Sequence, residues 1–257
     1  MGIMKIISLV ENTSLREEIK CEHGLSLFIE ACGKRILFDM GQSDLFLENA
    51  GTLGIDIKAV DIAVLSHGHY DHGGGLGKFL EINEGARVYI RKNAFLPHYN
   101  GEKYIGIDPS LENNSRIIIT EGDFSLAEGL TLCSPDFKSE AYGRLTVKRG
   151  EKFLPDPFDH EQYLLIEENG KRVLISGCSH RGILTIAEYF KPDVLIGGFH
   201  FMDTPLDERL AAIGRRLDLI DCDFYTCHCT GVDRYEFLTQ YVKRIGYLSS
   251  GDEIAIE

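Results

Sequence analysis

The stretch SHGHYDHGGG, residues 66–75, holds three of the chain's nine histidines within six positions and ends in three glycines. It overlaps the end of a short apolar run, DIAVLS, which predicts a buried strand that stops where the histidines begin. His67 and His69 are two positions apart, so in extended backbone both side chains leave from the same side. After the chain bends, Asp71 and His72 can face a second position. Imidazole nitrogens and carboxylate oxygens are ligands of zinc, iron and manganese, so the stretch predicts a transition-metal site.

The composition describes an ordinary globular chain of 257 residues with a formal charge of −13. No apolar run approaches the roughly 18 residues that a membrane span requires, and the N-terminus lacks the basic start of a secretory signal. Seven cysteines without a framework spacing fit reduced thiols, and the negative charge disfavours binding to long nucleic acids. We therefore expect a cytoplasmic protein that binds a small molecule and neither nucleic acid nor membranes. The sequence leaves its oligomeric state open.

Strands and helices alternate along the chain, and residues 1–257 are expected to form one domain. The clearest hairpin is YLLIEENGKRVLISG, because Asn169-Gly170 suits a type I′ turn between two apolar runs. Other apolar runs predict strands at MKIISLVE, at LSLFIEACGKRILFD with a turn at Gly33, and at ARVYIR, DVLIGGF and DFYTC. Helical patterns follow at GLGKFLEIN, GILTIAEYF, PLDERLAAIGRRLDLI and RYEFLTQYVKRIG. Hairpins mixed with strand–helix alternation predict mixed sheets with helices on their outer faces.

The segment from about residue 92 to 160 differs from the rest, because it holds five of the seven prolines and only short apolar runs. It predicts an irregular excursion with a few strands, RIIIT and LTLCS among them, that serves as a lid or pocket wall. Its histidines, His98 and His160, are expected at the surface, with a position in the lid as the alternative. The cations in or beside it are candidates for binding an anionic group: Arg91, Lys92, Lys103, Arg116, Arg144, Lys148 and Arg149.

Residues 66–72 resemble the His-x-His-x-Asp-His signature of the metallo-β-lactamase-fold hydrolases. The resemblance runs from His23 to Gly231, where HGLSLFIE, RILFDMGQS, LSHGHYDHGGGL, ISGCSHRGI, VLIGGFHF and CHCTG look like the dihydropterin–ribofuranosylaminobenzene phosphate synthase-like subgroup. It implies an α/β (α+β) four-layer αβ/βα sandwich, with two mixed sheets face to face, helices outside and metals at one edge. Asp39 would then orient the loop of His67, although an aspartate before Gly41 also suits a simple turn.

The chain departs from the wider superfamily at two ligand positions. In that family a histidine follows the strand after the first helix, whereas ARVYIRKNAF offers Arg91 and Lys92. The family's bridging aspartate ends a Gly-Asp step, and the matching step here is Gly177-Cys178. Either the thiolate of Cys178 bridges the metals, or His180 replaces the missing histidine from a nearby loop, and both can hold. A lone cysteine after an apolar strand is also typical of a buried core thiol.

Three further histidines complete the expected site. His228, in CHCTG, ends a predicted strand and matches the closing metal ligand of the superfamily. His200, after VLIGGF, is expected on the substrate side, and His23 is a second candidate for substrate binding. The full set of expected metal ligands is His67, His69, Asp71, His72, Cys178, His180 and His228.

These residues predict a metal-dependent hydrolase of a small phosphorylated or carboxylated molecule. Two zinc ions are expected, with iron or manganese as the alternatives, and they lower the pKa of a shared water toward roughly 7. Asp71 is expected to orient that nucleophile, and His200 or His180 to donate a proton to the leaving group. Two alternatives stay open: an iron-containing redox or oxygen-handling protein, which a sulfur ligand would favour, and a small-ligand-binding protein with little turnover.

Overall fold

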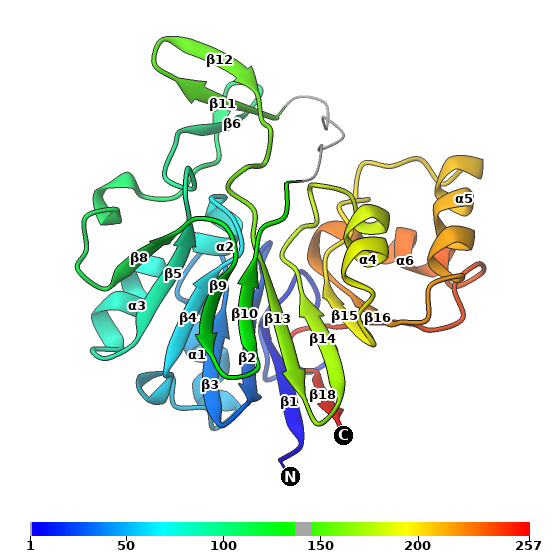
Figure 1. The fold of residues 1–257 in the computed structure, drawn as a ribbon, viewed down its shortest axis with the longest axis horizontal. Helices are drawn as coiled ribbons and strands as arrows, with labels where there is room; N and C mark the ends of the chain where they lie inside the picture. Colours follow the sequence, from blue (N-terminus) through cyan, green and yellow to red (C-terminus); the bar gives the residue numbers. More distant parts are fainter. Residues whose placement is uncertain (1, 137–144) are drawn as a thin grey trace.

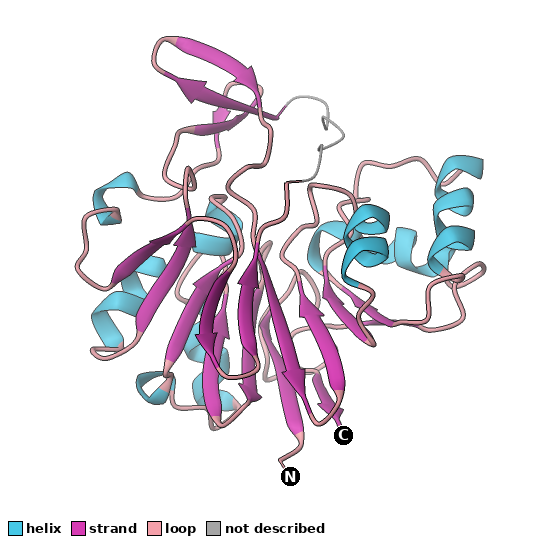
Figure 2. Ribbon diagram, in the orientation of Figure 1, coloured by secondary structure: helices cyan, strands magenta, loops and turns pink. Residues whose placement is uncertain are grey.

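The computed structural model describes residues 2–136 and 145–257, and two seven-stranded sheets form its centre (Figures 1 and 2). The first sheet begins with antiparallel neighbours and continues in parallel from β3 to β8. Its order is β18 (Glu253–Ile256), β1 (Met4–Val10), β2 (Ser26–Ala31), β3 (Lys34–Phe38), β4 (Ile62–Leu65), β5 (Arg87–Arg91) and β8 (Ile117–Thr120).

The second sheet is also mixed, with parallel pairing from β14 to β17 and antiparallel pairing on the other side. Its order is β17 (Ile245–Tyr247), β16 (Asp223–Thr226), β15 (Val194–Gly197), β14 (Lys171–Ile175), β13 (Tyr163–Glu168), β10 (Leu130–Cys133) and β9 (Phe124–Ala127). The predicted hairpin is confirmed, because β13 and β14 pair around Asn169 and Gly170, which both have positive φ.

The main hydrophobic core lies between the two sheets. Strand β4 shows how the sequence produces this arrangement, because all four of its residues are buried. Ile62 and Val64 point into the core between the sheets, whereas Ala63 and Leu65 pack on the side of the helices. A strand covered on both faces reads as a continuous apolar run, which is what DIAVL shows.

Helices cover the outer face of each sheet, so the predicted four-layer αβ/βα sandwich is confirmed (Figure 2). The first sheet is covered by α1 (Leu45–Thr52) and α3 (Leu76–Ile82), and the second by α4 (Ile183–Phe190), α5 (Glu208–Leu217) and α6 (Val232–Leu238). A further short helix is α2 (Tyr70–Gly73). Among the described residues, we find no helix with the length and apolar character that crossing a bilayer requires.

The prediction that residues 92–160 form an irregular excursion was wrong in one respect, because strands occupy much of its described part. RIIIT and LTLCS form β8 and β10 as expected. The segment also supplies β9 to the second sheet. A separate four-stranded sheet has the order β12 (Lys152–Pro155), β11 (Leu145–Arg149), β6 (His98–Asn100) and β7 (Lys103–Tyr104). Figure 1 shows β6, β11 and β12 above the sandwich, and we call this element the third sheet.

Strands β4, β14, β15 and β16 each end just before a group of polar residues that the sequence singles out. The ends of these strands lead to His67, Cys178, His200 and His228 respectively. Because β14, β15 and β16 are parallel neighbours, their carboxyl ends meet at one edge of the second sheet. The close approach of the loop after β4 to the loop after β14 requires a glycine at position 177, since a Cβ there would lie 2.2 Å from Ser66 Oγ.

Candidate metal centre

The seven expected metal ligands lie together: six of them form two adjoining groups, and Cys178 lies between these groups. One nitrogen from each of His67, His69 and His180 lies within 4.8 Å of the other two, and we call this group site A. Site B consists of Asp71, His72 and His228, whose Nε2 lies 3.2 Å from both Asp71 Oδ2 and His72 Nε2. All six side chains are buried.

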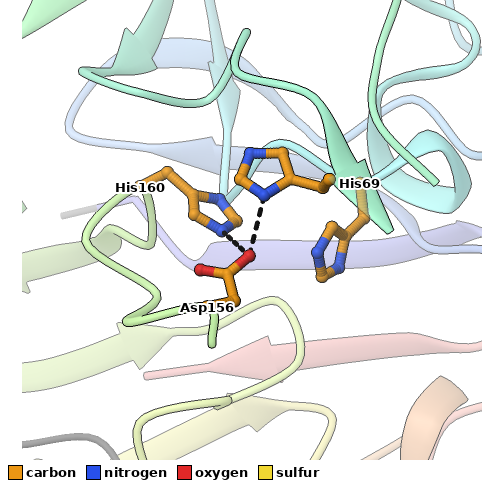
Figure 3. A group of neighbouring side chains, drawn as sticks. His69, Asp156 and His160 are labelled. Atoms are coloured by element: carbon orange, nitrogen blue, oxygen red, sulfur yellow. Dashed lines mark hydrogen bonds and ion pairs between the residues drawn. The ribbon is translucent and has the colours of Figure 1, made fainter. Parts of the chain in front are cut away.

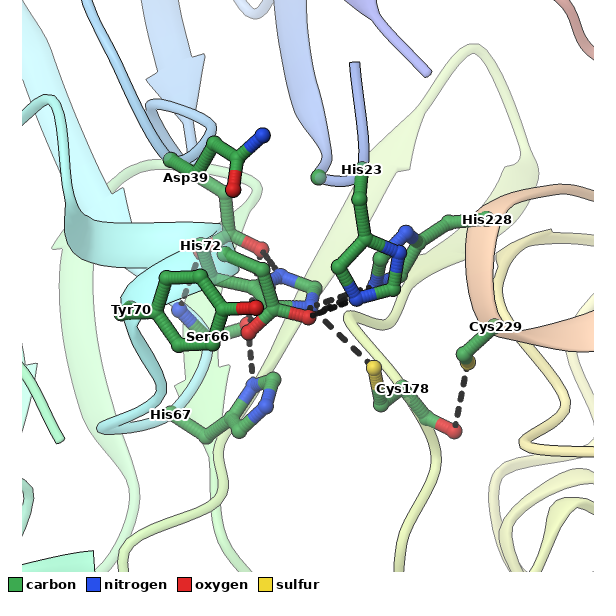
Figure 4. Close-up of polar contacts among 12 residues, drawn as sticks. His23, Asp39, Ser66, His67, Tyr70, His72, Cys178, His228 and Cys229 are labelled. Carbon is green, nitrogen blue, oxygen red and sulfur yellow. Dashed lines mark hydrogen bonds and ion pairs between the residues drawn. The ribbon is translucent and has the colours of Figure 1, made fainter. Parts of the chain in front are cut away.

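The carboxylate of Asp39 decides which ring nitrogen His67 and His72 offer to these sites (Figure 4). His72 Nδ1 donates to Asp39 Oδ2 at 2.6 Å, and the Ser66 hydroxyl donates to the same oxygen at 2.7 Å. Since its proton goes to Asp39, Ser66 Oγ accepts from His67 Nδ1 at 2.8 Å. In their neutral forms both rings therefore carry the proton on Nδ1 and turn the lone pair of Nε2 toward the sites. Asp39 has the orienting position that the resemblance implies.

His228 is oriented in the same way by Asn12. The Asn12 amide donates to the His228 backbone carbonyl at 3.3 Å and accepts from Gly24 N–H at 3.2 Å, so its Oδ1 is the acceptor. That oxygen lies 2.8 Å from His228 Nδ1, which therefore carries the ring proton. The lone pair of His228 Nε2 then faces the lone pair of His72 Nε2 and the carboxylate of Asp71.

The two sites have the electronic character of cation sites. In site B, His228 Nε2 lies 3.2 Å from both Asp71 Oδ2 and His72 Nε2, which are 4.0 Å apart from each other. When both rings are neutral, these three atoms are all acceptors and repel one another until a cation lies between them. In site A, His67 Nε2 faces His180 Nε2 at 3.3 Å. The Nε2 of His69 is buried, and no described residue hydrogen bonds to it. Imidazole-rich sets with one carboxylate suit zinc, so the residues fit the metal that the resemblance implies.

Cys178 lies between the two groups, at the position where a shared ligand belongs. Its Sγ is 3.1 Å from His72 Nε2, and it forms one cluster with His67 and His72 and another with His228 and Cys229. The structure thus brings both Cys178 and His180 to the site, and the two alternatives that the sequence left open are compatible. Burial and the neighbouring Cys229 raise the pKa of the Cys178 thiol well above its usual value.

The protonation of the imidazoles favours metal binding at neutral pH. Burial holds the pKa of His67, His69 and His180 well below the usual value, and it lowers the pKa of His228 to about 4. These rings are neutral at pH 7 and available as ligands. His72 is the exception. Burial alone would lower its pKa, but the carboxylates of Asp39 and Asp71 outweigh burial and raise it.

His200 and His23 both line the cavity in front of the metal centre. The His200 ring lies 4.3 Å from the His180 ring, and its backbone has the strained φ of +56°. His23 is exposed, and its Nε2 lies 3.2 Å from Asp71 Oδ2. Both positions agree with contacts to a substrate, and their roles stay predictions.

Two buried glutamates, which the sequence analysis missed, hold the loops of His180 and His228. Glu161 Oε1 accepts from the His180 backbone N–H at 2.8 Å, and Glu11 Oε1 accepts from the His228 backbone N–H at 2.6 Å. Both glutamates are fully buried. Each glutamate borders an apolar strand, Glu11 directly after β1 and Glu161 two residues before β13, and that position was the only local signal. A buried carboxylate needs such partners. Cys229 was missed as well, although its Sγ lies in the cluster with Cys178 and His228.

The expectation that His98 and His160 are surface residues was wrong. Both are buried, with exposed fractions of 1% and 0%. They surround the carboxylate of Asp156 beside His69 (Figure 3). The proline-rich surroundings suggested an open loop, whereas the third sheet and the chain after it fold over these rings. Arg91 ends β5 and donates to the Thr120 carbonyl, so it does not replace a metal ligand.

A cavity of about 680 Å³ opens in front of the two sites. Its walls include Asp71 and Cys178 from the metal centre, His200 beside that centre, Lys103 from the third sheet and Arg209 from α5. Of the cations expected to bind an anionic group, Lys103 is the one that lines this cavity, and Arg144 lies outside the described residues. The cavity has the size of a site for a small molecule.

Comparisons with known proteins agree with this geometry. The family model of the metallo-beta-lactamase superfamily matches residues 19–214. An uncharacterized protein of Methanocaldococcus jannaschii is 32% identical over 90% of this chain and 93% of its own length. From the same organism, 7,8-dihydropterin-6-methyl-4-(beta-D-ribofuranosyl)-aminobenzene-5'-phosphate synthase is 29% identical, over 89% of this chain and 88% of its own.

Solved structures extend the comparison to the whole fold. The crystal structure of Tm1679, described as a metal-dependent hydrolase of the beta-lactamase superfamily, has a TM-score of 0.82 and 31% identity, and covers 98% of both chains. The metallo-beta-lactamase fold protein YhfI from Bacillus subtilis has a TM-score of 0.66 at 13% identity, covering 99% of this chain and all of its own. The second likeness supports the fold alone.

The first prediction concerns Asp39. In Asp39→Asn, an amide replaces the carboxylate that accepts from His72 and Ser66, so the ring protons lose the acceptor that fixes them. Zinc affinity, measured by competition with a chelator, should fall about 10- to 100-fold. The exposed Asp44, whose side chain caps no helix, supplies the matched control Asp44→Asn, which should bind zinc normally. Wild-type affinity in Asp39→Asn would contradict the orienting role.

The second prediction concerns the proton that Cys178 must lose. Because its pKa is raised, the thiol is protonated at pH 7 in the metal-free protein, and ligation requires its deprotonation. Zinc binding should therefore release about one proton fewer per chain in Cys178→Ala, and the affinity of the wild type should rise more steeply with pH. A pH indicator in weak buffer measures the release. Cys133→Ala, at a thiol whose burial raises its pKa to about 12, is the control. Equal release from all three proteins would leave Cys178 as a core thiol.

Proposed function

The chain belongs to the metallo-beta-lactamase superfamily, and from this premise we propose that it is a metal-dependent hydrolase of a small phosphorylated or carboxylated molecule. The observation that carries the proposal is the pairing of two adjoining cation sites with a cavity of about 680 Å³. Among the similar proteins, Tm1679 is described as a metal-dependent hydrolase. The donor set of imidazoles, one carboxylate and one thiolate favours zinc, ahead of iron and manganese.

The residues of the two sites have distinct roles in this proposal. When bound, two zinc ions would supply the Lewis acidity that activates a water at a pKa of about 7 and polarises an oxygen of the substrate. His67, His69 and His180 would hold one ion, and Asp71, His72 and His228 would hold the other. Cys178 lies where it contacts both groups. The same Oδ2 of Asp71 that belongs to site B lies 3.2 Å from His23 Nε2 at the cavity wall, where this carboxylate would orient the nucleophile.

His200 is the proposed proton donor to the leaving group. It lines the cavity beside His180, and its backbone conformation is held by a hydrogen bond from its own N–H to Cys229 Sγ at 3.3 Å. A donor at this position reaches a leaving group without displacing any of the six imidazole and carboxylate ligands of sites A and B.

The cations of the cavity wall support an anionic substrate. Lys103 Nζ donates to Tyr70 OH at 3.1 Å and lies 4.7 Å above its ring. Within residues 2–136 and 145–257, no carboxylate forms an ion pair with Lys103, so its charge is available to a ligand. Arg209 faces the same cavity from α5, although Asp203 and Asp207 line that side as well. Lys103 is therefore the better placed anchor.

A synthase reaction is the second candidate. The curated relative that is 29% identical is named as a synthase, and the name of its product includes a 5'-phosphate. A phosphate on the ligand agrees with the charge of Lys103. Iron-based redox chemistry and ligand binding without turnover are distinguished from both by metal analysis and by mass spectrometry of co-purifying small molecules.

The third prediction tests the anionic substrate. The zinc-loaded protein should hydrolyse chromogenic phosphate esters or carboxylated esters better than neutral esters and lactones. Replacing Lys103 with Gln removes one charged contact, worth about 1.5–3 kcal/mol, so kcat/KM for the anionic substrates should fall about 10- to 100-fold. The kcat/KM for the neutral substrates and the zinc content of the variant should not change.

The control is Lys148→Gln, because Lys148 lies on β11 of the third sheet, with its Nζ 5.8 Å above the Phe153 ring. An equal loss on neutral and anionic substrates in Lys103→Gln would contradict the assignment of Lys103. If a protein that holds two zinc ions hydrolyses none of these substrates, that result would favour a synthase reaction or ligand binding without turnover.

A further inference from the structure

Three buried polar side chains beside site A have no part in the proposed chemistry: His98, Asp156 and His160. His98 belongs to β6, and Asp156 and His160 belong to the loop between β12 and β13. Together with His69 they place four ligand-type atoms within 4.8 Å of one another (Figure 3). The His98 and His160 rings lie 4.0 Å apart, and each of them lies about 5.5 Å from the His69 ring, at 5.5 and 5.4 Å.

The hydrogen bonds of Asp156 fix the proton of His160. The Phe158 backbone N–H donates to Asp156 Oδ1 at 2.8 Å, which leaves Oδ2 for the rings. His98 Nδ1 lies 2.7 Å from Oδ2, and His160 Nε2 lies 3.3 Å from it. His160 therefore carries its proton on Nε2, and its Nδ1 accepts from the Gly68 backbone N–H at 2.9 Å.

Gly68 lies between two ligands of site A, so its position affects both. A Cβ at Gly68 would lie 2.1 Å from the Ala94 carbonyl oxygen, which shows how closely this backbone is packed. The hydrogen bond to His160 holds it from a second direction. His67 and His69, on either side of Gly68, can share an ion only while this backbone keeps its course.

We infer that Asp156, His160 and His98 form a positioning network, which holds the His67–Gly68–His69 backbone in the geometry that site A needs. The inference rests on the metal centre of the proposed function. Asp156 fixes the tautomer of His160, His160 accepts from Gly68, and His98 packs against His69 while it donates to Asp156. The network makes metal binding at site A depend on the chain segment that carries the third sheet.

The alternative interpretation is that these four residues bind a third metal ion. The hydrogen bond from Gly68 N–H to His160 Nδ1 argues against it. An ion bound by His160 Nε2 would move the ring proton to Nδ1, where it would face the Gly68 N–H. Two donors would then point at each other in a buried place, and the backbone of His67 and His69 would have to move. The observed bonds instead give both nitrogens of His160 a partner.

The fourth prediction uses Asp156→Asn. Because Phe158 N–H fixes the oxygen of the new amide, its NH2 group would face His160 Nε2, and that nitrogen would have to become an acceptor. The ring proton would move to Nδ1 and break the hydrogen bond from Gly68. Stepwise zinc binding, measured by chelator competition, should weaken about 10- to 100-fold at site A alone. The step that is missing in His180→Ala identifies site A.

The matched control is Asp159→Asn, three residues along the same loop, where the carboxylate pairs with the side chains of Arg149 and Asn93 rather than with His98 or His160. It should bind zinc as the wild type does. If wild-type protein binds two ions and Asp156→Asn binds both with unchanged affinity, the network is overturned while the metal centre stands. If wild-type protein binds none, the proposed function fails instead.

A second pair of variants separates positioning from general loss of stability. In His160→Asn, Oδ1 takes the place of Nδ1 and can still accept from Gly68, whereas in His160→Gln the amide reaches Asp156 and leaves Gly68 without an acceptor. Site A should retain its affinity in the first variant and lose it in the second. Adding Asp156→Asn to His160→Asn should have no further effect, since the acceptor no longer depends on a tautomer. A third bound zinc ion that His98→Ala removes would overturn the inference.

Discussion

Three buried carboxylates, each accepting a backbone N–H from a loop that carries metal ligands, are the interaction on which the rest of the centre depends. Asp39 accepts from Ser66, Glu161 from His180, and Glu11 from His228. A carboxylate in the interior is tolerated only when its lone pairs are used. The buried carboxylates and the ligand-bearing loops therefore depend on each other. The loops give the carboxylates their donors, and the carboxylates give the loops one conformation before any ion arrives.

The backbone conformations of these loops show how tightly they are specified. Asp39, Ser179, His200 and His228 all have positive φ, between +48° and +60°. Side chains other than glycine rarely adopt this conformation, and such residues persist where the surroundings over-determine them. All four lie at strand ends around the metal centre. The hydrogen bonds of the buried carboxylates and of Cys229 are part of what holds them there.

Local patterns in the sequence predict mixed sheets covered by helices and the candidate ligands at residues 67–72, whereas the four-layer sandwich and the other candidate ligands are implied by the resemblance to the family. An apolar run such as DIAVL identifies a strand buried on both faces, and the ligands follow such runs directly. Glu11 could not be assigned in this way, because its partner His228 is 217 positions away. His98 and His160 were misplaced for a related reason. The short strands that bury them form the four-stranded third sheet. Each of these strands is too short to show a recognisable alternation of apolar and polar residues.

The ligands of site A come from both halves of the sandwich, because His67 follows a strand of the first sheet and His180 follows a strand of the second. An ion bound at this place would connect the two sheets. It would close a loop of more than one hundred residues, and such long closures restrict the unfolded chain strongly. The lifetime of the protein in a cell would then follow the supply of metal, since chains without an ion would open more readily between the two sheets and become substrates for proteases.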